Sequence, residues 1–460
     1  MRRRLKTGLL QRELNKGRTK NPRRALAISL AAALLVGLIV VPAVADESKG
    51  AFQAAVKALE WRNIGPFNGG RGSSVVGHPT DRQVFWFGHS SGGLWKTEDA
   101  GTYWQPVGQG QFRYASVGAI ALHEKNPDIM YVGLGEPQMR QSASWGDGVY
   151  KTTDGGATWQ HLGLDEARQI SQIIIHPDDP DYVYVSSMGR AWGPSPERGV
   201  FRTKDGGKTW EKVLFKNDLT GTIDMVMSPK DPKVLFAAMW TFERKAWGAF
   251  FGGPDGGLWK STDGGDNWTE ITDNEGLPEG SWGRVGLTMS AADPKRVYAL
   301  IDNETQQGLY RSDDVGETWR LVSTDANILA RPFYFYHLEA DPSNADHLWV
   351  PGNKMWSSKD AGESWVLEPG VKDDFHDIWI DPKDPNRMIA TNDGGTAVTL
   401  TGGKTWSGFS NQSGAQMYRV DTDDQFPYHV YGNTQDLIVY RLPSASRWGG
   451  IPIHMTDFIG

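Results

Sequence analysis

One aspartate recurs at the same place in a phrase that returns along the chain, Ser/Thr-x-Asp-x-Gly-x-x-Trp. Its six copies carry Asp99, Asp154, Asp205, Asp263, Asp314 and Asp360. A loop of this kind could bind a metal or supply a catalytic carboxylate. However, near-copies in such number cannot all be active sites, and a seventh copy at residues 399–406 has Thr401 in place of the acid. We therefore interpret these aspartates as structural, bonding the N–H groups of a turn in which glycine takes positive φ.

Three long insertions hold the residues that are better suited to ligand binding. They span residues 135–147, 188–198 and 240–255, and they mix aromatics, arginines and carboxylates. This composition is typical of a carbohydrate or peptide site rather than a simple connector. The alternative is that the insertions pack on one another over a channel mouth. The candidate ligand-binding residues are Arg71, Arg140, Trp145, Asp147, Arg168, Trp192, Glu197, Arg244, Trp247 and Arg284.

Two kinds of charged chemistry are open to these residues. Arg71, Arg168 and Arg284 could converge and clamp an anion bidentately, or each could pair with a neighbouring acid. Glycoside hydrolysis would instead need two carboxylates about 5–9.5 Å apart. We take Glu136 and Asp224 as the best catalytic candidates. The other acids expected near them are Asp147, Glu197, Asp377 and Asp436.

The spacing of the repeated phrase predicts the elements that carry these residues. Successive copies start 41 to 58 residues apart, the length of one propeller blade. Residues 117–165 show four short strands bounded by Gly, Pro and Asp turns. The chain is thus predicted to be an all-β propeller of four-stranded antiparallel blades, without helices after residue 60. Because antiparallel strands alternate in direction, the repeated turns lie on one face and the three insertions on the other.

The number of blades is less clear from the sequence. Seven repeats are recognisable, and an eighth begins at residue 417 but lacks the repeated phrase. Residues 60–65 resemble an outer strand, which could close an eighth blade. The alternative, which we favour, is that the propeller of residues 60–460 is incomplete at its carboxyl end.

The first 45 residues have the pattern of an export signal. Residues 1–24 hold ten Lys/Arg and one acid, residues 25–41 are uncharged, and Ala43-Val44-Ala45 follows. We expect a signal peptide cleaved after Ala45, then a linker at residues 46–59, and a secreted or periplasmic protein. The alternative is an uncleaved membrane anchor with the propeller outside the cytoplasm.

Charge and composition exclude some partners. Residues 46–460 carry 38 basic and 54 acidic side chains, a net charge of −16. A domain this acidic lacks the general attraction needed for nucleic acid. The chain has no cysteine, so no disulfide supports the fold. We expect no cofactor, and no metal, since no acidic run has the ligand spacing of an EF-hand.

The repeated phrase resembles the Asp-box, or bacterial neuraminidase repeat (BNR), of sialidase and sortilin-type propellers. Residues 133–136 and 144–151 are similar to an exported bacterial family of sortilin amino-terminal-domain-like, glycosyl-hydrolase-like repeat proteins. The resemblance covers residues 60–460, and members of the family are typically much longer. It implies the propeller fold, whereas the hydrolase label is inherited from the repeat.

Relatives within this resemblance imply different activities. Sialidases have an Arg-Ile-Pro motif, whereas this chain has Ile64-Gly65-Pro66 without the arginine and shows no clear Tyr/Glu nucleophile pair. Xyloglucanases are similar in Gly69-Gly70-Arg71, but their second propeller is absent here. We therefore expect an extracytoplasmic propeller that binds a glycan or peptide on the face of the insertions. The alternatives are a glycoside hydrolase and a sortilin-like scaffold for exported proteins.

Overall fold

The computed structural model describes residues 44–59, 63–369, 373–409, 411–435, 439–445 and 457–459. The predicted signal peptide lies almost entirely outside these residues and stays a prediction. Helix α1 (Val44–Lys57) occupies most of the expected linker. Ala51, Ala54 and Ala55 favour this helix by propensity, and Lys57 in the last turn complements its dipole. No helix among the described residues is long and apolar enough to cross a membrane.

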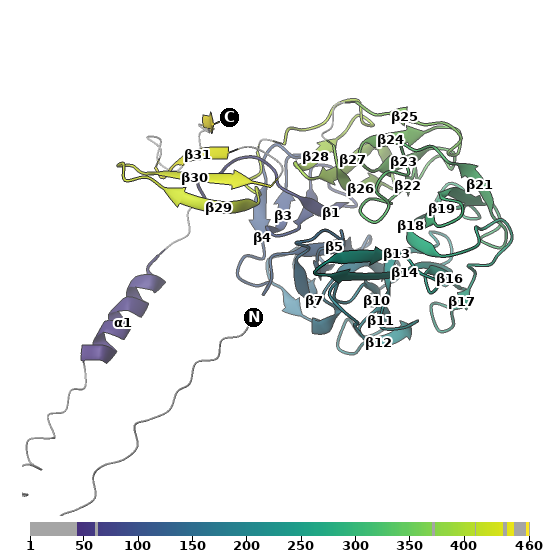
Figure 1. The fold of residues 1–460 in the computed structure, drawn as a ribbon, viewed down its shortest axis with the longest axis horizontal. Helices are drawn as coiled ribbons and strands as arrows, with labels where there is room; N and C mark the ends of the chain where they lie inside the picture. The colour runs from purple at the N-terminus through teal and green to yellow at the C-terminus, as the bar shows by residue number, and fades with distance from the viewer. Residues whose placement is uncertain are drawn as a thin grey trace, which may run out of the picture. The chain divides into compact units, whose positions relative to one another are not determined.

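Seven antiparallel sheets follow one another and form the ring in Figure 1. Blade 1 has β1 (Gly72–Gly77), β2 (Phe85–His89), β3 (Gly93–Thr97) and β4 (Gln105–Val107). Blade 2 has β5 (Val117–Leu122), β6 (Met130–Gly135), β7 (Trp145–Thr152) and β8 (Gln160–His161). Blade 3 follows a 3-10 turn, η1 (Asp165–Ala167), and has β9 (Ile170–His176), β10 (Asp179–Ser187), β11 (Gly199–Thr203) and β12 (Glu211–Leu214).

Blade 4 carries one additional strand. It has β13 (Thr220–Met227), β14 (Leu235–Lys245), β15 (Gly248–Phe251), β16 (Gly257–Ser261) and β17 (Thr269–Glu270). Blade 5 has β18 (Trp282–Met289), β19 (Val297–Asn303), β20 (Gly308–Ser312) and β21 (Arg320–Ser323). Blade 6 has β22 (Glu339–Ala340), β23 (Leu348–Pro351), β24 (Met355–Ser358) and β25 (Val366–Leu367). Blade 7 has β26 (Phe375–Asp381), β27 (Asp384–Asn392) and β28 (Gly395–Thr399).

The repeated phrase makes the same turn in each blade. In the second copy, the Thr152 hydroxyl donates to Asp154 Oδ1 at 2.7 Å and accepts the Gly156 N–H at 3.0 Å. Asp154 also accepts the Thr158 N–H at 2.9 Å. In the seventh copy the Thr401 hydroxyl accepts the equivalent Thr405 N–H at 2.9 Å. A hydroxyl therefore replaces the carboxylate without loss of the turn.

The apolar cores lie between successive blades. Val149 of blade 2, for example, belongs to a cluster with Ile173, Val183 and Val185 of blade 3. These clusters use the side chains that alternate along each strand, so each sheet is covered on both faces. The blades are thus held by burial of apolar surface rather than by disulfides.

One arginine joins blade 7 to blade 1. Arg387 in β27 is completely buried and donates five hydrogen bonds. One bond goes to Asp381 at 2.8 Å, and four go to backbone carbonyls of the turn between β1 and β2, including those of His78 and Val84 at 3.0 Å. The guanidinium also lies 4.2 Å from the centre of the Phe85 ring. The ring therefore closes at seven blades.

The eighth repeat lies outside this ring. It forms a separate sheet of β29 (Met417–Thr422), β30 (His429–Thr434), β31 (Val439–Pro443) and β32 (Asp457–Ile459), beside the ring in Figure 1. The alternative of an eight-bladed ring is therefore wrong, because β1 already contacts β26 and no place remains for another blade. Residues 63–65 form no strand, and residues 60–62 of the expected outer strand lie outside the described residues.

We predict that Arg387→Met lowers the free energy of unfolding of the ring by about 3–5 kcal/mol, because it leaves Asp381 and four carbonyls without their donor. Chemical denaturation followed by circular dichroism measures this. Arg82→Met is the matched control, since Arg82 pairs with Asp384 across the same joint but is 55% exposed. The control should cost less than about 1 kcal/mol. Equal losses in the two variants would contradict the role assigned to Arg387.

Candidate functional site

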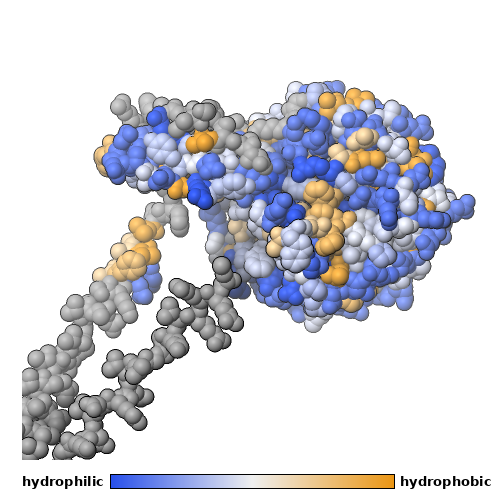
Figure 2. Space-filling model, in the orientation of Figure 1, coloured by the Kyte–Doolittle hydropathy of each residue, from blue (hydrophilic) through white to orange (hydrophobic). Residues whose placement is uncertain are grey.

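The three insertions interlock on one face of the ring, called here the insert face. Arg244 from blade 4 donates its side-chain N–H to the Met139 carbonyl of blade 2, and its backbone N–H to Ala191 of blade 3 at 2.8 Å. Arg198 is completely buried and donates to the Phe242 carbonyl at 3.0 Å. Part of the insertion sequence is thus structural, as the packing alternative expects. Figure 2 shows a mostly hydrophilic surface with apolar residues gathered near the middle of the ring.

An aromatic hollow remains on this face where the insertions of blades 2 and 3 meet. It has a volume of about 410 Å³, and Trp145 and Trp192 line it with 56% and 49% of their surfaces exposed. The other lining residues are small or hydroxyl-bearing: Ser91, Tyr114, Ala115, Ser116, Ser142, Ala143 and Ser144. The Arg168 guanidinium lies 5.4 Å from the centre of the Trp145 ring. The hollow therefore offers apolar ring surface surrounded by hydrogen-bonding groups.

Glu136 is held in an internal ion pair. Its side chain is completely buried, and its carboxylate accepts from Arg140 Nε at 2.5 Å and from the Ser144 N–H at 3.2 Å. Arg140 also donates to Gln435 at 3.2 Å. Glu136 and Arg140 therefore hold the blade 2 insertion in place. A catalytic role for Glu136 stays a prediction.

The three arginines expected at the axis have different surroundings. The side chains of Arg71 and Arg284 both donate to Tyr334, Arg71 to its hydroxyl and Arg284 to its carbonyl at 3.0 Å. Arg71 also pairs with Asp393. Arg168 instead pairs with Glu166 at 2.6 Å, beside the aromatic hollow. The structure thus brings two of the three together, and all three have local partners.

The remaining predicted residues are spread over the insert face. Asp147 is buried at the start of β7, and Trp247 is 83% exposed in the tight turn between β14 and β15. Glu197 lies 3.7 Å from Lys212, which is a loose surface pair. Asp436 lies outside the described residues. Among the described residues, neither Glu136 nor Asp147, Glu197 or Trp247 lines the cavity that Asp224 lines.

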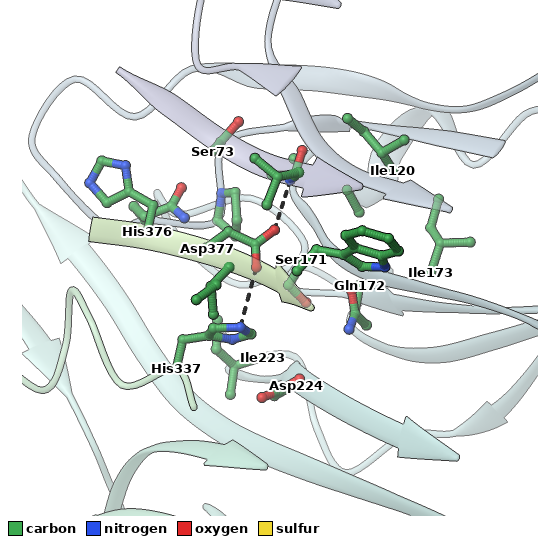
Figure 3. Close-up of a pocket in the computed structure, with 18 of the residues that line it drawn as sticks. Ser73, Ile120, Ser171, Gln172, Ile173, Ile223, Asp224, His337, His376 and Asp377 are labelled. Atoms are coloured by element: carbon green, nitrogen blue, oxygen red, sulfur yellow. Dashed lines mark hydrogen bonds and ion pairs between the residues drawn. The ribbon is translucent and has the colours of Figure 1, made fainter. Parts of the chain in front are cut away.

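A second hollow, the axial cavity, lies on the ring axis. It has a volume of about 210 Å³ and is lined by the inner strands of the blades. Asp224 lines it and accepts the N–H groups of Met225 at 2.8 Å and Leu287 at 2.9 Å. Asp377 likewise accepts the Val75 N–H of the next blade at 2.9 Å (Figure 3). Both carboxylates thus link the inner strand of one blade to that of its neighbour.

His337 and Glu339 complete the axial cavity. The His337 imidazole pairs with Asp377 at 3.2 Å, and Figure 3 shows it directed toward that carboxylate. Neither residue is among the predicted site residues. His337 lies in the irregular segment 331–338, and Glu339 begins the two-residue strand β22. An His-x-Glu pair two residues apart, with both side chains on one face, is the only local signal that could have indicated them.

Burial and charge shift the titration of this cluster. Burial raises the pKa of Asp224, and burial raises the pKa of Glu339 to about 7. Burial opposes the charge of His337, but the bond and charge of Asp377 outweigh it and hold the His337 pKa at about 9. At these two groups the folded protein therefore holds more protons than the unfolded chain between about pH 4.5 and 9.

We predict that the Tm falls by about 2–5 °C between pH 5 and 9, because stability is lost as Glu339 and His337 release protons that the unfolded chain releases at lower pH. Glu339→Gln should roughly halve this fall, because the amide is neutral at every pH. Differential scanning calorimetry measures both slopes. Glu275→Gln, at an exposed position, changes the same charge and should keep the wild-type slope. An unchanged slope in Glu339→Gln would contradict the titration assigned to the axial cavity.

A family profile and two known proteins are similar to this chain in sequence. The family profile described as "Sortilin-Vps10: Sortilin, neurotensin receptor 3" matches residues 147–275. A xyloglucanase of Paenibacillus sp is 24% identical over 389 residues, covering 75% of this chain and 35% of that protein. The photosystem II assembly lipoprotein Ycf48 of Trichormus variabilis is 25% identical over 237 residues, covering 40% of this chain and 69% of that protein.

A solved structure supports the same fold. The Niastella koreensis GH74 enzyme matches with a TM-score of 0.57 and 16% identity, covering 82% of this chain and 60% of that one. The chain spans about a third of the length of the Paenibacillus xyloglucanase. Family profile, relatives and architecture agree with the resemblance to sortilin-like propellers drawn from the repeated phrase, and the chain has the β-propeller fold.

Proposed function

We propose that this propeller works outside the cytoplasm and binds a β-linked glucan chain, of the xyloglucan class, in the aromatic hollow of the insert face. The observation that carries the proposal is the pair of half-exposed tryptophans, Trp145 and Trp192, in one hollow. Sugar rings present flat C–H faces that pack on indole rings, and their hydroxyls need hydrogen-bond partners at the edges. The serine side chains around the hollow supply such partners.

The surroundings of Trp145 support a binding surface that is formed in advance. Arg168 lies over the indole and is itself held by Glu166 at 2.6 Å. Ser144, the residue before Trp145, is tied to the buried Glu136 through its backbone N–H. A side chain that is fixed before binding loses less conformational freedom when the ligand arrives. Glu136 and Arg168 therefore support binding without touching the sugar.

Three relatives bear on the choice of ligand, and they do not all favour the same class. The Paenibacillus protein is named a xyloglucanase and the Niastella protein a GH74 enzyme, which favours a glucan. The relative Ycf48 is named an assembly lipoprotein, which favours a protein or peptide ligand. We commit to the glucan because the hollow combines aromatic faces with hydroxyls.

Hydrolysis of the glucan is the second candidate, favoured by the xyloglucanase relatives. It requires an acid and a second carboxylate about 5–9.5 Å apart on either side of the scissile bond. The residues that line the aromatic hollow include no Asp or Glu. We therefore place binding first and treat release of reducing ends as the alternative outcome.

We predict that Trp145→Ala and Trp192→Ala each weaken binding of xyloglucan oligosaccharides roughly tenfold, because each removes one stacking surface. Isothermal titration calorimetry measures the affinities. Tyr103→Ala is the control, since Tyr103 is 65% exposed in a repeated turn on the opposite face and should bind like wild type.

The same samples distinguish the alternatives. Reducing-sugar assays on the incubated oligosaccharides should show binding without release of new ends. Release by wild type would replace the binding proposal by the hydrolase, and equal affinities in all three variants would overturn the location of the site.

A further inference from the structure

The axial cavity is lined by buried polar atoms that have no partner among the described residues. Gln138, from the blade 2 insertion, is only 3% exposed, and its side-chain oxygen accepts no hydrogen bond from them. Arg284 is 6% exposed and uses Nη1 to bond the Tyr334 carbonyl, but its Nε donates to none of them. Since buried polar atoms are normally paired, both atoms call for an occupant of the cavity.

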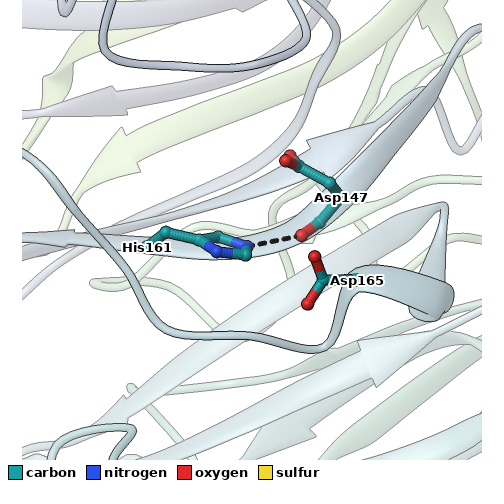
Figure 4. Close-up of side chains that lie close together, drawn as sticks. All are labelled: Asp147, His161 and Asp165. Carbon is teal, nitrogen blue, oxygen red and sulfur yellow. Dashed lines mark hydrogen bonds between the residues drawn. The ribbon is translucent and has the colours of Figure 1, made fainter.

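The Glu339 carboxyl group is a third polar group of this kind. The buried carboxylate of Asp147 shows the usual situation, because it accepts from the Tyr150 hydroxyl at 3.1 Å and is turned away from His161 and Asp165 in Figure 4. Glu339 lines the axial cavity, and no hydrogen bond or ion pair joins its side chain to the described residues. The cavity thus presents an unpaired amide oxygen, an unpaired N–H donor and an unpaired carboxyl group.

The charges around the cavity nearly cancel one another. Arg284 and His337 are cationic, Asp224 and Asp377 are acidic, and Glu339, with a pKa of about 7, is half protonated at neutral pH. A metal ion would be repelled by the two cations and would leave the N–H donor unpaired. An anion would be repelled by the carboxylates and would leave the amide oxygen unpaired. An ion of either sign therefore satisfies only part of the cavity.

We propose that the axial cavity binds one neutral monosaccharide. Every sugar hydroxyl both donates and accepts hydrogen bonds, as a serine hydroxyl does. One sugar ring can therefore donate to the Gln138 oxygen, accept from Arg284 Nε and pair with the Glu339 carboxyl group in either protonation state. Ordered water alone is the alternative occupant.

The size and the apolar lining of the cavity fit a single sugar ring. Its volume of about 210 Å³ lies below the about 300–1,000 Å³ of sites for drug-sized ligands, so a glucan chain does not fit. Ile120, Ile173 and Ile223 line it as well (Figure 3) and can pack against the C–H groups of the ring. The cavity shares no lining residue with the aromatic hollow, so this inference does not rest on the proposed function.

Titration of the full chain with D-glucose, followed by saturation-transfer difference NMR, tests the proposal. We expect saturable binding of D-glucose, and about fivefold or more weaker binding of D-glucuronate and of protonated D-glucosamine, which carry opposite charges. No saturable binding of D-glucose would leave water as the occupant and overturn the proposal. A preference for either charged analogue would overturn the assignment of a neutral ligand.

Gln138→Met tests the position of the sugar, because methionine has a similar volume but no amide. It should weaken D-glucose binding about fivefold or more, since a sugar hydroxyl is left unpaired in a buried site. The variant should keep the wild-type Tm, because the amide oxygen that it removes has no partner among the described residues. Gln105→Met is the matched control, since Gln105 is exposed on β4 and should bind D-glucose like wild type.

Trp145→Ala distinguishes the axial cavity from the aromatic hollow. It removes a stacking surface of the hollow, so it should weaken binding of xyloglucan oligosaccharides and leave the affinity for D-glucose unchanged. The proposal is overturned if Gln138→Met binds D-glucose like wild type, or if Trp145→Ala loses D-glucose binding while Gln138→Met keeps it.

Discussion

Arg387 joins the last blade to the first, and the closure of the ring depends on the joint between these two blades. A ring of separate sheets has no covalent closure here, and the chain has no cysteine to supply one. Apolar burial between neighbours is non-directional and would tolerate other numbers of blades. The buried guanidinium is directional, because its five donors meet the carbonyls of one turn and the Asp381 carboxylate. It therefore fixes which two sheets meet.

Closure at seven blades also determines what reaches the axis and what reaches the insert face. Asp224 and Asp377 bond the inner strands of adjacent blades, and His337 and Glu339 share the small cavity between them. The charged side chains at the axis thus hold neighbouring blades together. On the insert face, buried residues such as Glu136, Arg198 and Arg244 hold the insertions together, which leaves Trp145 and Trp192 exposed. We therefore expect the glucan to bind the exposed aromatic side chains rather than the acids nearest the axis.

The repeated turn could be predicted from sequence because its hydrogen bonds are local: Thr152, Asp154 and Gly156 lie within five residues. The assignment of faces could be predicted as well, since it needs only the alternation of strands. Blade number could not, because the contacts of Arg387 with residues 78–84 join segments about 300 residues apart and have no local pattern. The burial of Glu136 could not be predicted either, because the sequence does not distinguish a buried ion pair with Arg140 from an exposed one. The axial cavity becomes visible only when the inner strands of several blades are placed together.

We propose that the insert face binds a glucan through Trp145 and Trp192, and a crystal structure of the protein with a xyloglucan oligosaccharide is the decisive measurement. We expect sugar rings stacked on these two indoles, with hydroxyls bonded to the serines around them. An oligosaccharide bound only at another surface, with both indoles uncovered, would contradict it.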